Sequence, residues 1–101
     1  MKPQRAAVAA VFLVLPVLSS ASEALADQHG CLNCHAIERR VLGPSFKEVA
    51  EKYRGQPGAE EAVLGRVAAG NVGLWGRVPM PGMAHVPADD LRAIVAWLLK
   101  T

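Results

Sequence analysis

Apolar residues recur at helical spacing in three segments of this 101-residue chain. In the first segment, four apolar residues fall at i, i+3, i+4 and i+7, which places them on one face of a helix: Phe46, Val49, Ala50 and Tyr53. The turn-forming run Gly43-Pro44-Ser45 precedes them, and Gly55 ends the helix. Glu48 and Lys52 form a favourable i, i+4 pair on the outer side.

A second helix is predicted from Ala59 to Ala69, followed by Gly70 as the C-cap. Its inward-facing residues are predicted to be Leu64, Val67 and Ala68.

The last helix is predicted to follow Pro87. Asp89 and Asp90 lie in its first turn and Lys100 at its end, and both placements suit the helix dipole. Its apolar stripe consists of Leu91, Ile94, Val95 and Leu98. Because no segment has a convincing strand pattern, the chain is predicted to be all-α, with three to four short helices.

The N-terminus has the pattern of a secretory signal. Lys2 and Arg5 give a positive start, residues 6–18 are uncharged and mostly apolar, and Ser19-Ser20-Ala21 supplies small residues for cleavage. An uncleaved membrane anchor is the alternative, but this stretch is shorter than the roughly 20 residues needed to span a bilayer, and Pro16 interrupts it. The pattern favours a signal peptide over residues 1–21 and a periplasmic protein.

Two cleavage points compete. Cleavage after Ala26 would leave only residues 27–30 before the first cysteine. Cleavage after Ala21 leaves Ser22 as an N-cap and Glu23 in the first turn of a short helix that runs into Gly30. We therefore expect residues 22–101 to form the single domain of the mature protein.

Residues 22–101 carry nine basic and nine acidic side chains, so their net charge is zero. This balance gives no indication of nucleic-acid binding. A chain of this length has difficulty building a core on its own, and a large apolar cofactor would give its short helices a surface to bury. Removal of that cofactor should leave the chain largely unfolded.

The run Cys31-Leu32-Asn33-Cys34-His35 has the spacing of a c-type haem attachment site. Two thiols separated by two residues can reach the two vinyl groups of one porphyrin, and the next imidazole can bind the iron. Other functions of the cysteines are a redox-active pair, a structural disulfide or half of a zinc site. The flanks lack the βαβ pattern of a thioredoxin-like protein, and only His29 and His85 remain as further histidine ligands for zinc.

The stretch between Gly70 and Pro87 is the segment that packing explains least, and long loops of this kind are usually functional. Pro79 and Pro81 flank Met80 and restrict its backbone. Given the haem motif upstream, the Met80 thioether is the candidate sixth ligand of the iron, and the alternative is a methionine that fills the core.

In order along residues 22–101, five features resemble a small bacterial class I monohaem cytochrome c: the haem motif, Gly43-Pro44, Trp75-Gly76, residues 78–81 and a closing helix with Trp97. This resemblance implies a cytochrome c fold wrapped around one covalent haem. It also implies that the Pro44 carbonyl accepts the Nδ1 proton of His35, and that Arg66 and Trp75 donate hydrogen bonds to a haem propionate.

The chain departs from such proteins at Met83, where relatives often carry an asparagine, so Met83 is a rival ligand to Met80. His85 and His29 are expected to be exposed.

The functional prediction is a periplasmic electron carrier with His35 and Met80 as iron ligands and no enzymatic activity. A six-coordinate iron has no open position for a substrate, and methionine ligation raises the reduction potential. Expected partners are a quinol-oxidising complex as donor and a terminal oxidase or nitrite reductase as acceptor, with the protein monomeric and not inserted in the membrane. The alternatives are a five-coordinate haem protein that binds gas or reduces peroxide, and a haem subunit of a larger redox enzyme.

Overall fold

The computed structural model describes residues 9–10 and 17–101, so most of the predicted signal peptide lies outside the described residues. Within them the chain forms α1 (Val17–Gln28), a 3₁₀ turn η1 (Cys31–Asn33), α2 (Phe46–Tyr53), α3 (Ala59–Ala69) and α4 (Ala88–Leu98). This part of the chain has no strand, only an isolated antiparallel bridge between Asn71 and Met80. The all-α prediction is confirmed.

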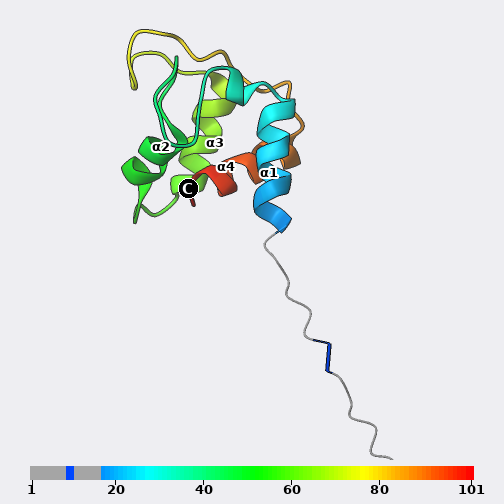
Figure 1. Ribbon diagram of the computed structural model, residues 1–101. Helices are drawn as coiled ribbons and strands as arrows, with labels where there is room; N and C mark the ends of the chain where they lie inside the picture. The colour runs from blue at the N-terminus through cyan, green and yellow to red at the C-terminus, as the bar shows by residue number, and fades with distance from the viewer. Residues whose placement is uncertain (1–8, 11–16) are drawn as a thin grey trace, which may run out of the picture.

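Helix α4 lies at the centre of the molecule and contacts α1, α2 and α3 (Figure 1). The predicted apolar stripe of α4 is buried throughout. The core that forms around it joins residues of all four helices: Ala26, Phe46, Val49, Tyr53, Val63, Ile94, Val95 and Leu98. Lys100 follows the end of α4 at Leu98, so the last turn itself carries no basic side chain.

Ser45 starts α2 through a reciprocal pair of hydrogen bonds. Its hydroxyl accepts from the Glu48 backbone N–H at 3.0 Å, and the Glu48 carboxylate accepts from the Ser45 backbone N–H at 2.7 Å. Each bond satisfies an N–H that has no partner inside the helix. The predicted apolar face of α2 is entirely buried, which confirms the helix, its bounds and its orientation.

The same hydrogen bond from the Ser45 N–H holds the pKa of Glu48 below its ordinary value, against the opposing effect of burial and with help from the charge of Arg40. Because the folded-state pKa is lowered, this contribution to stability is present above the ordinary glutamate pKa. It is lost as the pH falls through the folded-state value.

Helix α3 has the predicted bounds but not quite the predicted inner face. Leu64, Val67 and Ala68 are half-buried, while Val63, which the prediction omitted, is 4% exposed. Val63 and Val67 line the cleft described below, whereas Leu64 and Ala68 are not among its lining residues, so the inner face of α3 includes the cleft side that the prediction left out.

In the full chain helix α1 begins at Val17, whereas the N-cap expected of Ser22 concerns the chain cleaved after Ala21 and stays a prediction. Ser22 lies inside the helix and is buried. Because residues 17–21 are already helical, the backbone N–H groups just after Ser22 have carbonyl partners in the preceding turn and need no cap. None of the helices in the described residues is both long and apolar enough to cross a membrane.

Replacing Ser45 with alanine removes the hydroxyl from the α2 cap and should lower the free energy of unfolding by about 1 kcal/mol. Urea unfolding followed by circular dichroism measures this change. Lys47→Ala is the control, because the Lys47 ammonium makes only an exposed 3.5 Å ion pair with Glu38. Its effect should stay below about 0.5 kcal/mol, and equal effects of the two substitutions would contradict the role of the cap.

Candidate cofactor site

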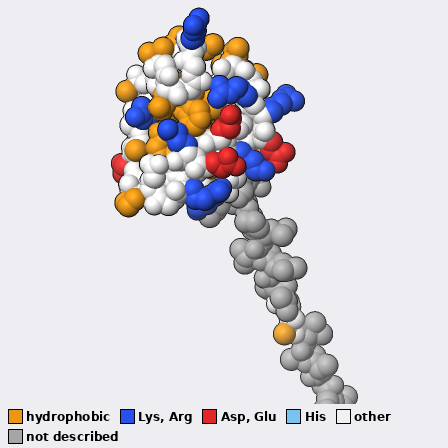
Figure 2. All heavy atoms as spheres, turned by 90° about the vertical axis from the view of Figure 1, so that its left-hand side faces the viewer, with side chains coloured by type: hydrophobic (Ala, Val, Ile, Leu, Met, Phe, Trp, Pro, Cys, Tyr) orange, Lys and Arg blue, Asp and Glu red, His pale blue; other side chains and the backbone are white. Residues whose placement is uncertain are grey.

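An open, mainly apolar cleft of about 250 Å³ separates the segment after η1 from the loop between α3 and α4. Figure 2 looks onto this side of the molecule and shows apolar side chains in a hollow, with both basic and acidic side chains around it. The apolar wall comes from α2, α3 and α4, through Phe46, Val49, Tyr53, Val67, Ile94 and Val95.

The residues of the cleft suit a haem. Cys31, Cys34, His35 and Met80 all border it, so two thiols, one imidazole and one thioether face a single apolar space. Arg40, Arg66 and Arg77 border it too, while no Asp or Glu is found among its described lining residues. A haem is a flat apolar group with two carboxylates. The apolar walls of the cleft suit its ring, and the arginines suit its carboxylates.

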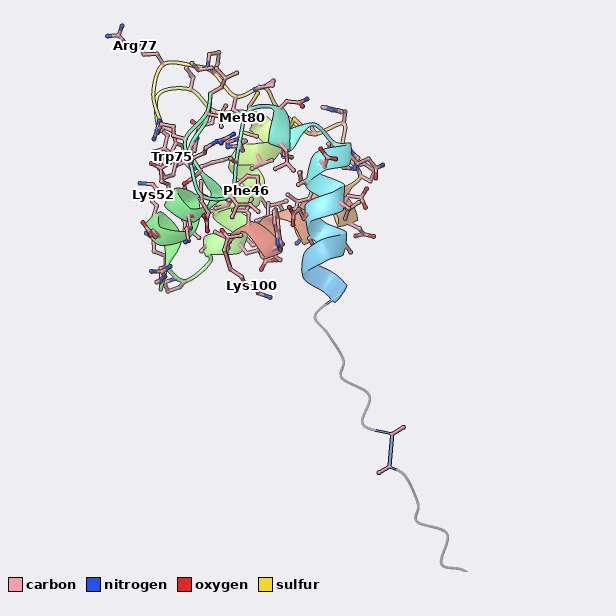
Figure 3. All side chains as sticks on the ribbon, viewed as in Figure 1. Phe46, Lys52, Trp75, Arg77, Met80 and Lys100 are labelled. Carbon is pink, nitrogen blue, oxygen red and sulfur yellow. The ribbon has the colours of Figure 1, made fainter. Side chains whose placement is uncertain are left out.

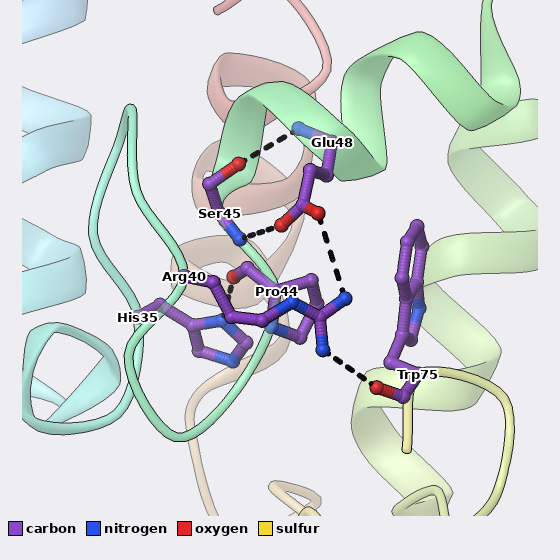
Figure 4. Close-up of polar contacts among 6 residues, drawn as sticks. All are labelled: His35, Arg40, Pro44, Ser45, Glu48 and Trp75. Atoms are coloured by element: carbon purple, nitrogen blue, oxygen red, sulfur yellow. Dashed lines mark hydrogen bonds and ion pairs between the residues drawn. The ribbon is translucent and has the colours of Figure 1, made fainter.

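His35 is oriented by its contact with the segment that precedes α2. Its Nδ1 lies 2.7 Å from the carbonyl oxygen of Pro44, the contact that the resemblance implies, and Pro44 is buried (Figure 4). A carbonyl oxygen only accepts, so Nδ1 carries the proton and Nε2 keeps the lone pair that binds a metal. The imidazole also stacks on Phe46, with the ring centroids 5.3 Å apart.

Gly43 lets the backbone pass close to that imidazole. A Cβ at this position would lie 2.6 Å from His35 Cε1 and 3.0 Å from Nδ1, closer than carbon atoms tolerate. Gly43 is therefore required by the position of His35.

The loop that carries Met80 is joined to the end of α3. Asn71 and Met80 exchange two backbone hydrogen bonds, of 3.0 and 2.7 Å. The approach is close, because a Cβ at Gly70 would lie 3.0 Å from the Met80 carbonyl oxygen, and one at Gly82 would lie 2.9 Å from that of Ala68. The contact places Met80 at the cleft.

Met83 is not among the described lining residues of the cleft, and its N–H bonds to the Val67 carbonyl. His85 is exposed, as predicted.

Arg66 and Trp75 also border the cleft. Arg66 lies in the last turn of α3 with an exposed side chain, and Trp75 is half-buried in the loop. Lys52 of α2 lies over the Trp75 ring, with Nζ 5.7 Å from the centroid (Figure 3). The structure thus brings both residues to the face where the resemblance expects propionate donors.

Two contacts, one of Arg40 and one of His29, were not predicted from the sequence. Arg40 donates a 2.8 Å hydrogen bond to the Trp75 carbonyl oxygen, which no local pattern indicates. His29 was expected to be exposed, and this is wrong. Its side chain is 17% exposed, with Nε2 3.0 Å from Asp90 Oδ2 at the start of α4. Both partners are distant in the chain, so only the fold shows them.

The cysteines differ in environment: Cys31 is half-buried and Cys34 is exposed. Burial raises the pKa of the Cys31 thiol, opposed by a backbone hydrogen bond. Redox-active cysteine pairs depend on a thiol whose pKa is lowered, so the shift runs against that function. Among the residues that the structure describes, no three His, Cys, Asp or Glu side chains converge to hold a metal ion.

Comparisons with known proteins agree on one family. The family model described as Cytochrome c matches residues 19–101. Cytochrome c-551 of Allochromatium vinosum is 51% identical over 75 residues, which are 74% of this chain and 80% of that protein. Cytochrome c-551 of Pseudomonas aeruginosa is 42% identical over 78 residues, which are 77% of this chain and 74% of that protein.

The crystal structure of wild-type cytochrome c552 from Nitrosomonas europaea is also similar. It matches with a TM-score of 0.74 and 35% sequence identity, over 77% of this chain and 96% of that one. This match confirms the predicted fold.

Gly43→Ala should push the His35 imidazole away from the Pro44 carbonyl and destabilise the haem-loaded protein by about 1–3 kcal/mol, the usual cost of overpacking. Urea unfolding followed at the haem absorption band measures the change. Gly65→Ala is the matched control, because Gly65 lies inside α3, where an added methyl group would have no atom within 4 Å apart from its own helix backbone. There alanine should stabilise by about 0.5–1 kcal/mol, and a neutral Gly43→Ala would contradict the close approach.

Proposed function

The chain belongs to the cytochrome c family, its small relatives are electron carriers and not enzymes, and we propose that it carries single electrons through one covalent haem ligated by His35 and Met80. The observation that carries this proposal is that both cysteines, His35 and Met80 border one apolar cleft.

Each of these side chains has a distinct task. Cys31 and Cys34 form the thioether bonds, and His35 presents Nε2 because its Nδ1 donates to Pro44. Met80 would supply the second iron ligand from the loop that the Asn71 bridge holds in place. When bound, the haem supplies a one-electron iron couple whose potential methionine ligation raises.

Arg66 and Trp75 are proposed to bind a haem propionate. Both border the cleft, and a guanidinium and an indole N–H are suitable donors to a partly buried carboxylate. The apolar wall excludes water from the rest of the cleft. His35 and Met80 together would leave no open iron position for a substrate.

We propose that the protein works in the periplasm, after removal of residues 1–21, between a quinol-oxidising donor and an oxidase or nitrite reductase. The sequence of the first 21 residues supports this location. Around the cleft, the apolar side chains of Leu42, Leu74 and Val78 are exposed, and Arg77 borders it. A small apolar face of this kind suits brief redox encounters.

Replacing Met80 with alanine should abolish the methionine-to-iron charge-transfer band of the oxidised protein, because the sulfur ligand is lost. Met83→Ala should keep the band. Visible absorption spectra of the two variants make the comparison, and loss of the band in Met83→Ala alone would assign the ligand to Met83.

Carbon monoxide provides a second test of the closed iron. The reduced wild-type protein should bind it slowly, while reduced Met80→Ala should bind it at once. Rapid stoichiometric binding by the wild type would instead support a gas-binding haem protein.

Electron exchange with hexacyanoferrate should slow as ionic strength rises, although residues 22–101 carry no net charge, because the exposed Arg77 borders the cleft. Stopped-flow kinetics at low salt should show Arg77→Ala slower by about twofold to fivefold. Lys100→Ala is the control of equal charge, since Lys100 lies at the opposite end of the domain (Figure 3). Equal effects of the two substitutions would contradict local steering.

A further inference from the structure

Arg40 connects the two sides of the cleft. Its Nη1 donates a 2.8 Å hydrogen bond to the Trp75 carbonyl oxygen, and its Nη2 lies 3.5 Å from Glu48 Oε1 (Figure 4). Trp75 belongs to the same loop as Met80, whereas Glu48 belongs to α2 beside the His35 contact. One side chain therefore joins the loop of the proposed sulfur ligand to the helix behind the proposed nitrogen ligand.

Glu48 is a fixed partner for this guanidinium. Its other carboxylate oxygen accepts the 2.7 Å hydrogen bond from the Ser45 N–H, so the carboxylate is held by the start of α2. The same bond lowers the pKa of Glu48 and so stabilises its charged form. Arg40 is thus oriented before it meets the loop, although its own side chain is 48% exposed.

The tip of the loop, residues 72–79, has little else to hold it. The Asn71–Met80 bridge closes its base, and within the tip the Gly73 N–H bonds to the Gly76 carbonyl. Among the described residues, the bond from Arg40 is the one hydrogen bond that links the tip to a residue outside it. Val72, Leu74 and Val78 are exposed, so the apolar packing of the tip rests mainly on Trp75.

We propose that Arg40 is a positioning residue. Its hydrogen bond to the Trp75 carbonyl keeps the loop closed over the cleft, and the closed loop keeps Met80 bound to the iron. The inference rests on the proposed His35 and Met80 ligation. Without the hydrogen bond from Arg40, the tip opens away from the cleft more often. Because the same loop carries Met80, its sulfur then leaves the iron more often.

Displacement of the sulfur by imidazole in the oxidised haem-loaded protein tests this. Imidazole binds only after the sulfur leaves, so the rate at saturating imidazole is the rate of loop opening. Arg40→Ala should raise that rate by about threefold to tenfold, as expected for loss of a partly exposed charged hydrogen bond. Glu48→Gln should raise it less, since its amide oxygen still accepts from Ser45.

The matched control is Arg39→Ala. Arg39 is the adjacent exposed arginine, and it makes no hydrogen bond or ion pair in the described part of the chain. This variant loses the same charge and should stay within about twofold of the wild-type rate. Equal rates for the Arg39 and Arg40 variants would overturn the proposal.

Amide hydrogen exchange tests the hydrogen bond from Arg40 to Trp75 independently of the ligation of the iron by Met80. In Arg40→Ala, the Gly73 amide should exchange several times faster than in Arg39→Ala, while the Val95 amide in the middle of α4 should not change. Equal acceleration at Val95 would show a general loss of stability and overturn the proposal, as would unchanged exchange at Gly73. A wild-type spectrum without the charge-transfer band would refute the Met80 ligation, and the exchange comparison would still decide the role of Arg40.

Discussion

The hydrogen bond between His35 Nδ1 and the Pro44 carbonyl is the contact on which the arrangement of the site depends. It places the imidazole proton on Nδ1, leaves the Nε2 lone pair for a metal, and ties His35 to the residue before the α2 cap. Ser45 and Glu48 then start α2, and Glu48 orients Arg40, which reaches the loop of Met80. The two proposed iron ligands are thus connected through the backbone of Pro44 and Ser45, the side chains of Glu48 and Arg40, and the loop backbone between residues 75 and 80.

The wall of the cleft and the core of the protein are largely the same residues. Phe46, Val49, Val63 and Val95 belong both to the buried cluster and to the lining of the cleft. A chain this small has few apolar side chains to spare, so a flat apolar cofactor and the helices α2, α3 and α4 share one packed interior. The Gly70 and Gly82 contacts bring the Met80 loop against α3, which leaves the opposite side of that loop to cover the cleft.

Local patterns were sufficient to predict α2, α3 and α4 and the buried stripe of α4, because each depends on spacing within one helix. The haem motif and the proline pair around Met80 were also recognisable, because each consists of residues that are neighbours in the sequence. They lie on the two sides of the cleft. Other contacts depend on residues distant in the chain. His29 is held by Asp90, and Arg40 by Trp75, so neither position was predictable from its neighbours in sequence. In the full chain α1 extends five residues further toward the N-terminus than the helix expected after cleavage at Ala21, because residues 17–21 are helical too.

Ligation of the iron by Met80 can be tested without altering the chain. In the reduced protein labelled with ¹³C at the methionine methyl groups, a methyl group held over the haem is shifted far upfield by the ring current. Residue-assigned spectra should place the Met80 methyl there and leave the Met83 methyl in the ordinary range. A far-upfield signal assigned to Met83, or no such signal at all, would contradict the account.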